Sequence, residues 1–315
     1  MSNADPQNTP AEATDVSSTR PAWLAFLEKK IEEDREEYFA DETHDEIVRD
    51  VLLAPDDDDT VIAKAIERFM HQYITGDANE HLEMRKPPEY DAGGFLNNIA
   101  SIIYETAVHV PFTDIGHDRL ADLLIGIKSN AAEEYRLEAP AFVYYGWGLE
   151  VIASEWWNQG QVDGSLRFRD AQDASEACKS WINTSALMAK LFRGGMLDAD
   201  GPRWIFGDLK DAFEKRTKGD IATNVGRQAQ VLVTVNHILI AGETLVKEVK
   251  APSKKWFCDL SAEKWKFWAS KFQEAADAVG ENTRWGLKSR AQEAHDKMVK
   301  LYPEAFEEKP VEESA

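Results

Sequence analysis

Apolar side chains recur three and four residues apart along most of this chain. Leu27 and Ile31 belong to one such series, and Trp265, Trp268 and Phe272 belong to another. Side chains at these spacings lie on one face of an α helix, so each series predicts a helix with one buried face. The predicted helices cover residues 21–38, 47–52, 60–75, 95–110, 114–127, 140–157, 177–192, 202–213, 221–241, 262–279 and 283–301.

The pattern gives little indication of β structure. No stretch alternates strictly between apolar and polar residues, as the strands of a half-buried sheet do. The β-branched run from Val231 to Val235 continues from helix-forming residues upstream, and a short buried strand there is the alternative that periodicity leaves open. We therefore predict an all-α fold, either a multi-helix bundle or an irregular α-solenoid of roughly a dozen helices.

Residues typical of helix ends mark several boundaries. Ser261 is expected to cap the helix that follows it, and the four carboxylates of residues 56–59 suit the positive end of the next helix. Gly194 and Gly195 indicate the end of the helix before them. Gly242 is expected to bend or end the long apolar helix that begins near residue 221.

Composition divides the chain into three parts. Residues 1–20 are rich in Ser, Thr, Pro, Ala and Asp and are expected to form a disordered acidic and polar tail. Residues 21–303 are expected to form a single all-helical domain, with a subdivision near residue 160 as the alternative. Residues 304–315 are expected to form a flexible acidic tail.

The charge of the chain narrows the choice of partners. There are 57 acidic and 36 basic residues, which gives a formal net charge of −21 at pH 7. Such a field repels phosphate backbones and anionic lipid, so neither nucleic acid nor a membrane is an expected partner.

The most apolar window, residues 231–241, has about half the length of a membrane-spanning helix. Two cysteines make neither a disulfide framework nor a four-ligand zinc site, and no secretory leader is apparent. We expect an intracellular protein, cytoplasmic or alternatively nuclear.

Motifs that carry chemistry are absent from the sequence. The acidic run at Asp56 begins like a magnesium-diphosphate motif, but Thr60 stands where that motif needs a third carboxylate. There is no phosphate loop and no Gly-x-Ser-x-Gly nucleophile motif. The seven histidines are scattered, and His237 is the one that we expect to be buried. A hydrogen-bonded core imidazole is the favoured interpretation of His237, with a catalytic role as the alternative. We predict no metal and no cofactor, and the catalytic residues, if there are any, stay unknown.

Ten tryptophans are the least ordinary feature of the composition. Trp147, Trp156 and Trp157 fall in one predicted helix, and with His237 they are the candidates for an aromatic pocket between helices. Core packing is the favoured interpretation of these rings. Because Trp156 and Trp157 are adjacent, they cannot both face one core.

Two segments resemble those of a known family. One is GPRWIFGDLKDAFE at residues 201–214, and the other is LSAEKWKFW at residues 260–268, followed by the helix of residues 283–298. Together they resemble a fungal family of uncharacterised all-helical proteins, a domain of unknown function, mainly over residues 160–301. The resemblance implies an intracellular helical protein and supplies no catalytic residue.

The chain departs from the family pattern at three places. Residues 235–242 keep the final Ala-Gly of an apolar helix but lack its tryptophan. Ala262 stands where the family has leucine, and Ala269 stands where it has lysine.

The residue spacing within the first segment predicts which side chains are buried. Trp204, Leu209 and Phe213 are expected to face other helices. Asp208 and Asp211 are expected to be more exposed. Both segments are therefore expected to be core elements rather than a site.

The charge is unevenly distributed along the chain. Residues 28–59 carry fifteen acidic and four basic side chains, and residues 247–300 carry eight acidic and twelve basic ones. Two separately solvated faces would account for this. The competing hypothesis is that the two ends pack side by side, or meet across a dimer, so that basic helices relieve the repulsion among acidic ones.

With no catalytic motif, the sequence favours a non-enzymatic protein-interaction or scaffold module that binds another protein or itself. The alternative is a carrier or enzyme for a small apolar metabolite, bound in an aromatic pocket between helices. A cavity on the order of several hundred Å³ would favour the small molecule. A solid core with a large exposed apolar patch would favour the interaction module.

Overall fold

The computed structural model describes residues 20–35, 42–75, 92–130, 152–158, 171–197, 201–215, 219–252 and 260–307. Within these ranges the chain is all-α and contains no strand, as the sequence predicted. The helices are α1 (Ala22–Asp34), α2 (Glu42–Leu53), α3 (Val61–Thr75), α4 (Ala92–Ala107), α5 (Ile115–Ser129), α7 (Ala171–Arg193), α8 (Gly201–Phe213), α9 (Val225–Lys250), α10 (Ala262–Ala278) and α11 (Leu287–Leu301). Two 3₁₀ turns, η3 (Arg284–Gly286) and η4 (Pro303–Ala305), flank α11, and residues 152–158 are also helical.

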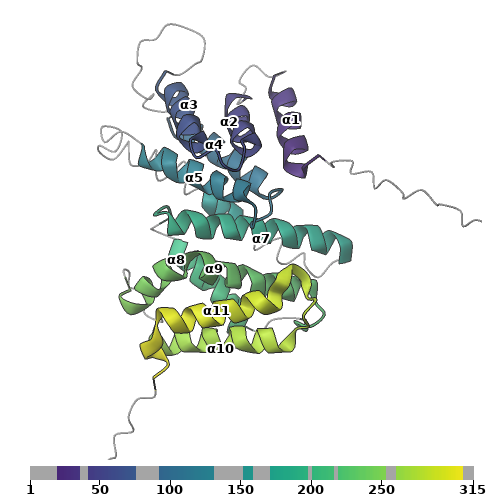
Figure 1. The fold of residues 1–315 in the computed structure, drawn as a ribbon, viewed down its shortest axis with the longest axis vertical. Helices are drawn as coiled ribbons and strands as arrows, with labels where there is room; N and C mark the ends of the chain where they lie inside the picture. The colour runs from purple at the N-terminus through teal and green to yellow at the C-terminus, as the bar shows by residue number, and fades with distance from the viewer. Residues whose placement is uncertain are drawn as a thin grey trace, which may run out of the picture.

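The helices are stacked nearly in the order of the sequence, except that α11 lies between α9 and α10 (Figure 1). Helices α1 to α5 make the upper half in that view, α7 crosses the middle, and α8 to α11 make the lower half. The chain therefore progresses from one end of the molecule to the other, although several closely packed pairs are not consecutive helices: α7 packs on α9, and α9 packs on α11.

Helix α7 lies between two hydrophobic cores and contributes to both. Leu187 and Leu191 belong to the upper core, with α2, α4 and α5. Trp181, Ile182 and Phe192 belong to the lower core, with α8, α9, α10 and α11. A helix with apolar residues on two faces is buried between layers, which explains the unbroken run of buried residues from 181 to 192.

Helix α9 is longer than predicted, because Gly242 does not end it. A Cβ atom at Gly242 would lie 3.1 Å from Leu301 Cδ1, so the glycine allows α11 to approach closely. By length and composition α9 could cross a membrane, but 72% of its most apolar 18-residue window is buried inside the fold. Its position in the core therefore accounts for its apolar character.

Side chains begin several helices as the sequence indicated. Ser261 Oγ accepts a hydrogen bond from the backbone N–H of Lys264, which confirms the predicted cap of α10. In the acidic run before α3, Asp58 accepts hydrogen bonds from the backbone N–H and the hydroxyl of Thr60. These bonds lower the pKa of Asp58, which keeps the exposed carboxylate ionised.

The ordered chain continues beyond the predicted boundary at residue 303. Turn η4 follows α11 directly, and Ala305 and Phe306 pack against the lower core. Residues 308–315 and the predicted tail before residue 20 lie outside the described residues, as do residues 140–151 of the predicted aromatic helix.

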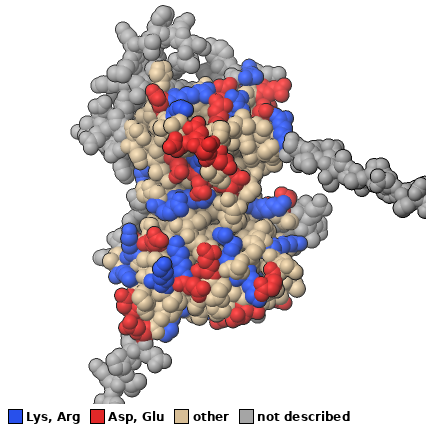
Figure 2. Space-filling view, in the orientation of Figure 1, with Lys and Arg blue, Asp and Glu red and all other residues tan. Residues whose placement is uncertain are grey.

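The two ends of the charge gradient are far apart. Helices α1 and α2 lie in the upper half, and α10 and α11 lie at the opposite end (Figure 1). The hypothesis that they pack side by side within one molecule is therefore wrong. On the face drawn in Figure 2, acidic side chains form a patch in the upper half, whereas acidic and basic side chains are interspersed in the lower half.

Candidate functional sites

A buried histidine–aspartate pair joins α8 to α9. His237 Nε2 lies 2.9 Å from Asp208 Oδ2, and the two residues are only 2% and 4% exposed. The other ring nitrogen, His237 Nδ1, has no hydrogen-bond partner within the described ranges. A carboxylate in this position orients an imidazole and favours a proton on Nε2.

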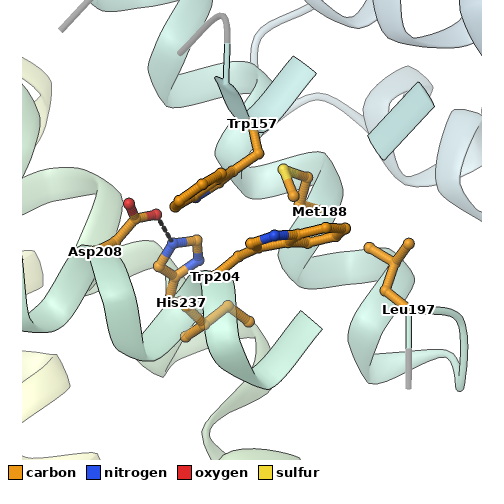
Figure 3. Close-up of a pocket in the computed structure, with 7 residues that line it drawn as sticks. Trp157, Met188, Leu197, Trp204, Asp208 and His237 are labelled. Carbon is orange, nitrogen blue, oxygen red and sulfur yellow. Dashed lines mark hydrogen bonds and ion pairs between the residues drawn. The ribbon is translucent and has the colours of Figure 1, made fainter. Parts of the chain in front are cut away.

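Aromatic and apolar side chains close over this pair (Figure 3). The indoles of Trp157 and Trp204 stack with their centroids 6.2 Å apart, and Met188, Leu197 and Ile205 complete the enclosure. The space left between these groups does not admit the centre of a water molecule. The histidine–aspartate pair is therefore part of a close-packed core and does not line an open pocket.

The structure brings together two of the four sequence candidates. Trp157 and His237 line this enclosure, whereas Trp156 stacks on Tyr104 of α4 at 6.1 Å. Trp147 lies outside the described residues. The neighbours Trp156 and Trp157 thus contact different partners, as adjacent helix positions require.

Two expectations about burial were wrong. Asp208 is not exposed, because it faces α9 and pairs with His237. His237 is not the one buried histidine, because His44 and His117 are buried as well. Helical periodicity could not predict these contacts, since it does not show which residue of another helix lies opposite.

A second site is a solvent-open cleft of about 870 Å³ at the junction of the two halves. Its walls come from the α4–α5 connection, the first half of α7, η3 and the start of α1. The apolar lining comprises Ala22, Val108, Pro111, Phe112, Ala177, Ile182 and Trp285. Its volume is in the range typical of sites for small organic ligands.

Several polar groups of the cleft are available to a ligand. The Thr113 and Ser180 hydroxyls, the His109 ring and the Trp285 indole form no hydrogen bond within the described part of the chain. Partial burial lowers the pKa of His109, so its ring is neutral at pH 7. At the rim, Lys179 Nζ lies 2.6 Å from Glu176 Oε1, and this pair leaves little net charge there.

A buried network holds the cleft wall in place. Asn183 Oδ1 accepts a hydrogen bond from the backbone N–H of Phe112, and Asn183 Nδ2 donates one to the carbonyl of Val108. Lys190 Nζ lies 3.0 Å from the Phe112 carbonyl oxygen, 3.1 Å from His117 Nδ1 and 3.0 Å from Asp118 Oδ1. These bonds anchor the α4–α5 connection to α7.

The same network determines the protonation of His117. Burial and, secondarily, the charge of Lys190 together lower the pKa of His117 to about 3. The ring is therefore neutral, accepts from Lys190 at Nδ1 and donates from Nε2 to the Asn183 carbonyl 3.1 Å away. Burial also lowers the pKa of Lys190, although its bond to Asp118 opposes that shift.

Trp285 holds an unusual backbone conformation in the cleft wall. Its φ is 59°, in the left-handed region that tryptophan rarely adopts, and Gly286 follows with φ 63°. Strained backbone of this kind is often found at functional sites. Nothing in the pattern of the sequence indicated that Trp285, Phe112 and Ser180 would line one site.

No group of three or more His, Cys, Asp or Glu side chains in the described ranges could hold a metal ion. The fold and these two sites define an all-helical protein with a closed aromatic core site and an open cleft between its halves.

The chain belongs to the DUF3632 family, described as a protein of unknown function, whose model matches residues 101–272. That segment runs from within α4 to within α10, and so begins and ends earlier than the residues 160–301 inferred from the sequence resemblance. No curated protein and no solved structure matches the chain.

Proposed function

We propose that this protein binds a small, largely apolar molecule in the cleft between its two halves, without transforming it. The observation that carries this proposal is the open cleft of about 870 Å³, with aromatic walls and a few hydrogen-bonding groups that have no partner among the described residues. Apolar surface and a small number of polar groups are the usual composition of small-molecule sites.

The cleft has the parts of a binding site rather than those of a catalytic centre. Ser180 and His109 both line it, but no hydrogen bond joins them. The His109 ring instead packs on Phe26, with centroids 4.9 Å apart. A serine nucleophile needs a base within hydrogen-bond reach, so this arrangement supports binding.

The surface supports the same choice over a protein-interaction module. Among the described residues, the exposed large hydrophobic side chains are Leu53, Ile115 and Phe267, on three different helices. Scattered apolar residues are ordinary on protein surfaces and do not make a large docking patch. The proposal also includes a cytoplasmic location, which the acidic, cysteine-poor composition supports.

Ser180→Trp tests the proposal, because it places an indole inside the cleft and removes no hydrogen bond of the described chain. The matched control is Ser270→Trp, which makes the same change on the exposed surface of α10. Native mass spectrometry of the full chain purified from its own cells measures the retained ligand. We expect wild type and the control to retain a small molecule and Ser180→Trp to lose it. Equal retention by both variants, or no ligand on wild type, would contradict the proposal.

A further inference from the structure

The Arg290 guanidinium lies against the cleft wall without a carboxylate partner. Its central carbon is 5.0 Å from the centroid of the Phe112 ring, and Phe112 lines the cleft. Arg290 Nη2 donates to Asn236 Oδ1 at 2.8 Å, and within the described residues no carboxylate oxygen lies within 4.0 Å of its nitrogens. Burial lowers the pKa of Arg290, which nevertheless stays charged at neutral pH.

Two buried donors at this position have no acceptor. Arg290 Nε and Asn236 Nδ2 are both buried without a hydrogen-bond partner in the described part of the chain. Asn236 is fully buried, so no water compensates its amide from the surface. A positive charge beside two unsatisfied donors is the chemical complement of an anionic oxygen.

The other cations around the cleft are already neutralised or solvated. Lys179 pairs with Glu176, and Lys190 pairs with Asp118. Arg284 precedes Trp285 directly but is exposed to solvent. Arg290 therefore combines a charge, partial burial and unused donors next to the cleft.

We propose that the cleft ligand is a small apolar acid whose carboxylate is recognised by Arg290 and Asn236. This inference rests on the proposed function, because it specifies the ligand of the same cleft. Binding requires the Phe112 ring to rotate, while the backbone of that residue stays anchored to Asn183 and Lys190. The apolar body of the ligand then occupies the space beside Trp285.

Two fluorescent probes test the inference on the full chain. N-phenyl-1-naphthylamine is uncharged, and 8-anilinonaphthalene-1-sulfonate has the same ring system with one anionic group. The measured quantity is the ratio of their dissociation constants, sulfonate over neutral, for each variant. This ratio isolates the anionic contact from general apolar binding.

Three substitutions separate the contributions. Arg290→Met removes the charge, and Asn236→Asp provides an internal carboxylate 2.8 Å from Arg290 Nη2. We expect each to raise the ratio about tenfold, as the loss of one charge-assisted contact would. Arg284→Met is the control for a nearby exposed arginine, and it should leave the ratio within about twofold.

The outcomes distinguish this inference from the proposed function. If the ratio is unchanged in both Arg290→Met and Asn236→Asp while Ser180→Trp weakens both probes, the cleft binds ligands but Arg290 recognises no acid. If Ser180→Trp weakens neither probe, binding at the cleft itself is refuted. Should Arg290→Met fail to fold, Asn236→Asp gives the same answer, because it keeps the arginine and its packing on Phe112.

Discussion

At the scale of single residues, buried polar pairs connect one helix to another. His237 and Asp208 are 29 residues apart, and Lys190 is 73 residues from His117. Each pair places a polar group where water cannot reach it, so each partner depends on the other. Such pairs specify one arrangement of the helices more strictly than apolar contacts do.

Removing one partner of the α8–α9 pair should destabilise the protein. Asp208→Leu leaves both ring nitrogens of His237 without a partner, at a cost of about 2 kcal/mol in the free energy of unfolding. Urea denaturation measures the difference. Asp211→Asn is the control on the same helix, since the Asp211 carboxylate pairs with Lys215 at the surface, and it should change stability by less than about 0.5 kcal/mol. An Asp208 variant as stable as this control would show that the pair has no energetic role.

The neutral state of His117 makes stability depend on pH. Its folded pKa, about 3, lies below the unfolded value of about 6.5, so the unfolded state binds more protons between these limits. Stability therefore falls as the pH is lowered through this range. From pH 7 to pH 5 the contribution of His117 is about 2 kcal/mol.

His117→Gln should remove that contribution. Urea denaturation at pH 7, 6 and 5 should show a smaller loss of stability for the variant than for wild type, although the variant is less stable at pH 7. Parallel pH profiles for the two proteins would mean that His117 does not titrate on unfolding in this range.

At the scale of elements, the hairpin between α10 and α11 contributes strain to the cleft wall. Trp285 and Gly286 both have positive φ, and they turn the chain into α11. Glycine adopts this conformation without the Cβ conflict that other residues meet. The tryptophan is thus present despite its backbone preference, as expected if its ring is needed in the cleft.

A pair of variants isolates the backbone strain from the loss of the ring. Trp285→Gly and Trp285→Ala both delete the indole, so the difference in their stability reports the backbone alone. We expect the glycine variant to be more stable by about 1 kcal/mol, the reverse of the order in a helix interior. Thermal denaturation of the two proteins checks this, and a more stable alanine variant would place residue 285 in an ordinary conformation in solution.

At the scale of the whole molecule, α7 couples the two cores. The helix presents Leu187 and Leu191 to the upper core and Trp181 and Phe192 to the lower one. Neither core is complete without it, so local unfolding of one half exposes apolar surface of the other. The cleft lies at this junction and is built from both halves.

This arrangement predicts that the folded region unfolds as one unit. Leu124→Ala in the upper core and Phe272→Ala in the lower core should each lower the free energy of unfolding by about 3 kcal/mol, and with it the denaturation midpoint. Each variant should still unfold in a single transition. Circular dichroism and tryptophan fluorescence should give coincident curves for both variants. Separate transitions would instead support a subdivision near residue 160.

The sequence alone determined the helical class and most helix positions. Spacings of three and four in Leu27 and Ile31, or in Trp265, Trp268 and Phe272, are local properties that hold whatever the helices pack against. The cap at Ser261 is local in the same sense, since its partner is three residues away. These features could be predicted because the chain itself sets the distances involved.

Tertiary structure alone decided the sites. Asp208 was expected to be exposed, because on its own helix nothing indicates that His237 faces it. Gly242 was expected to interrupt α9, because the sequence does not show that α11 packs there. The cleft joins Phe112, Ser180 and Trp285, and Arg290 reaches Asn236 across 54 residues. Contacts of this kind depend on how whole helices stack, and helical periodicity carries information only about the face of each helix, not about its neighbour.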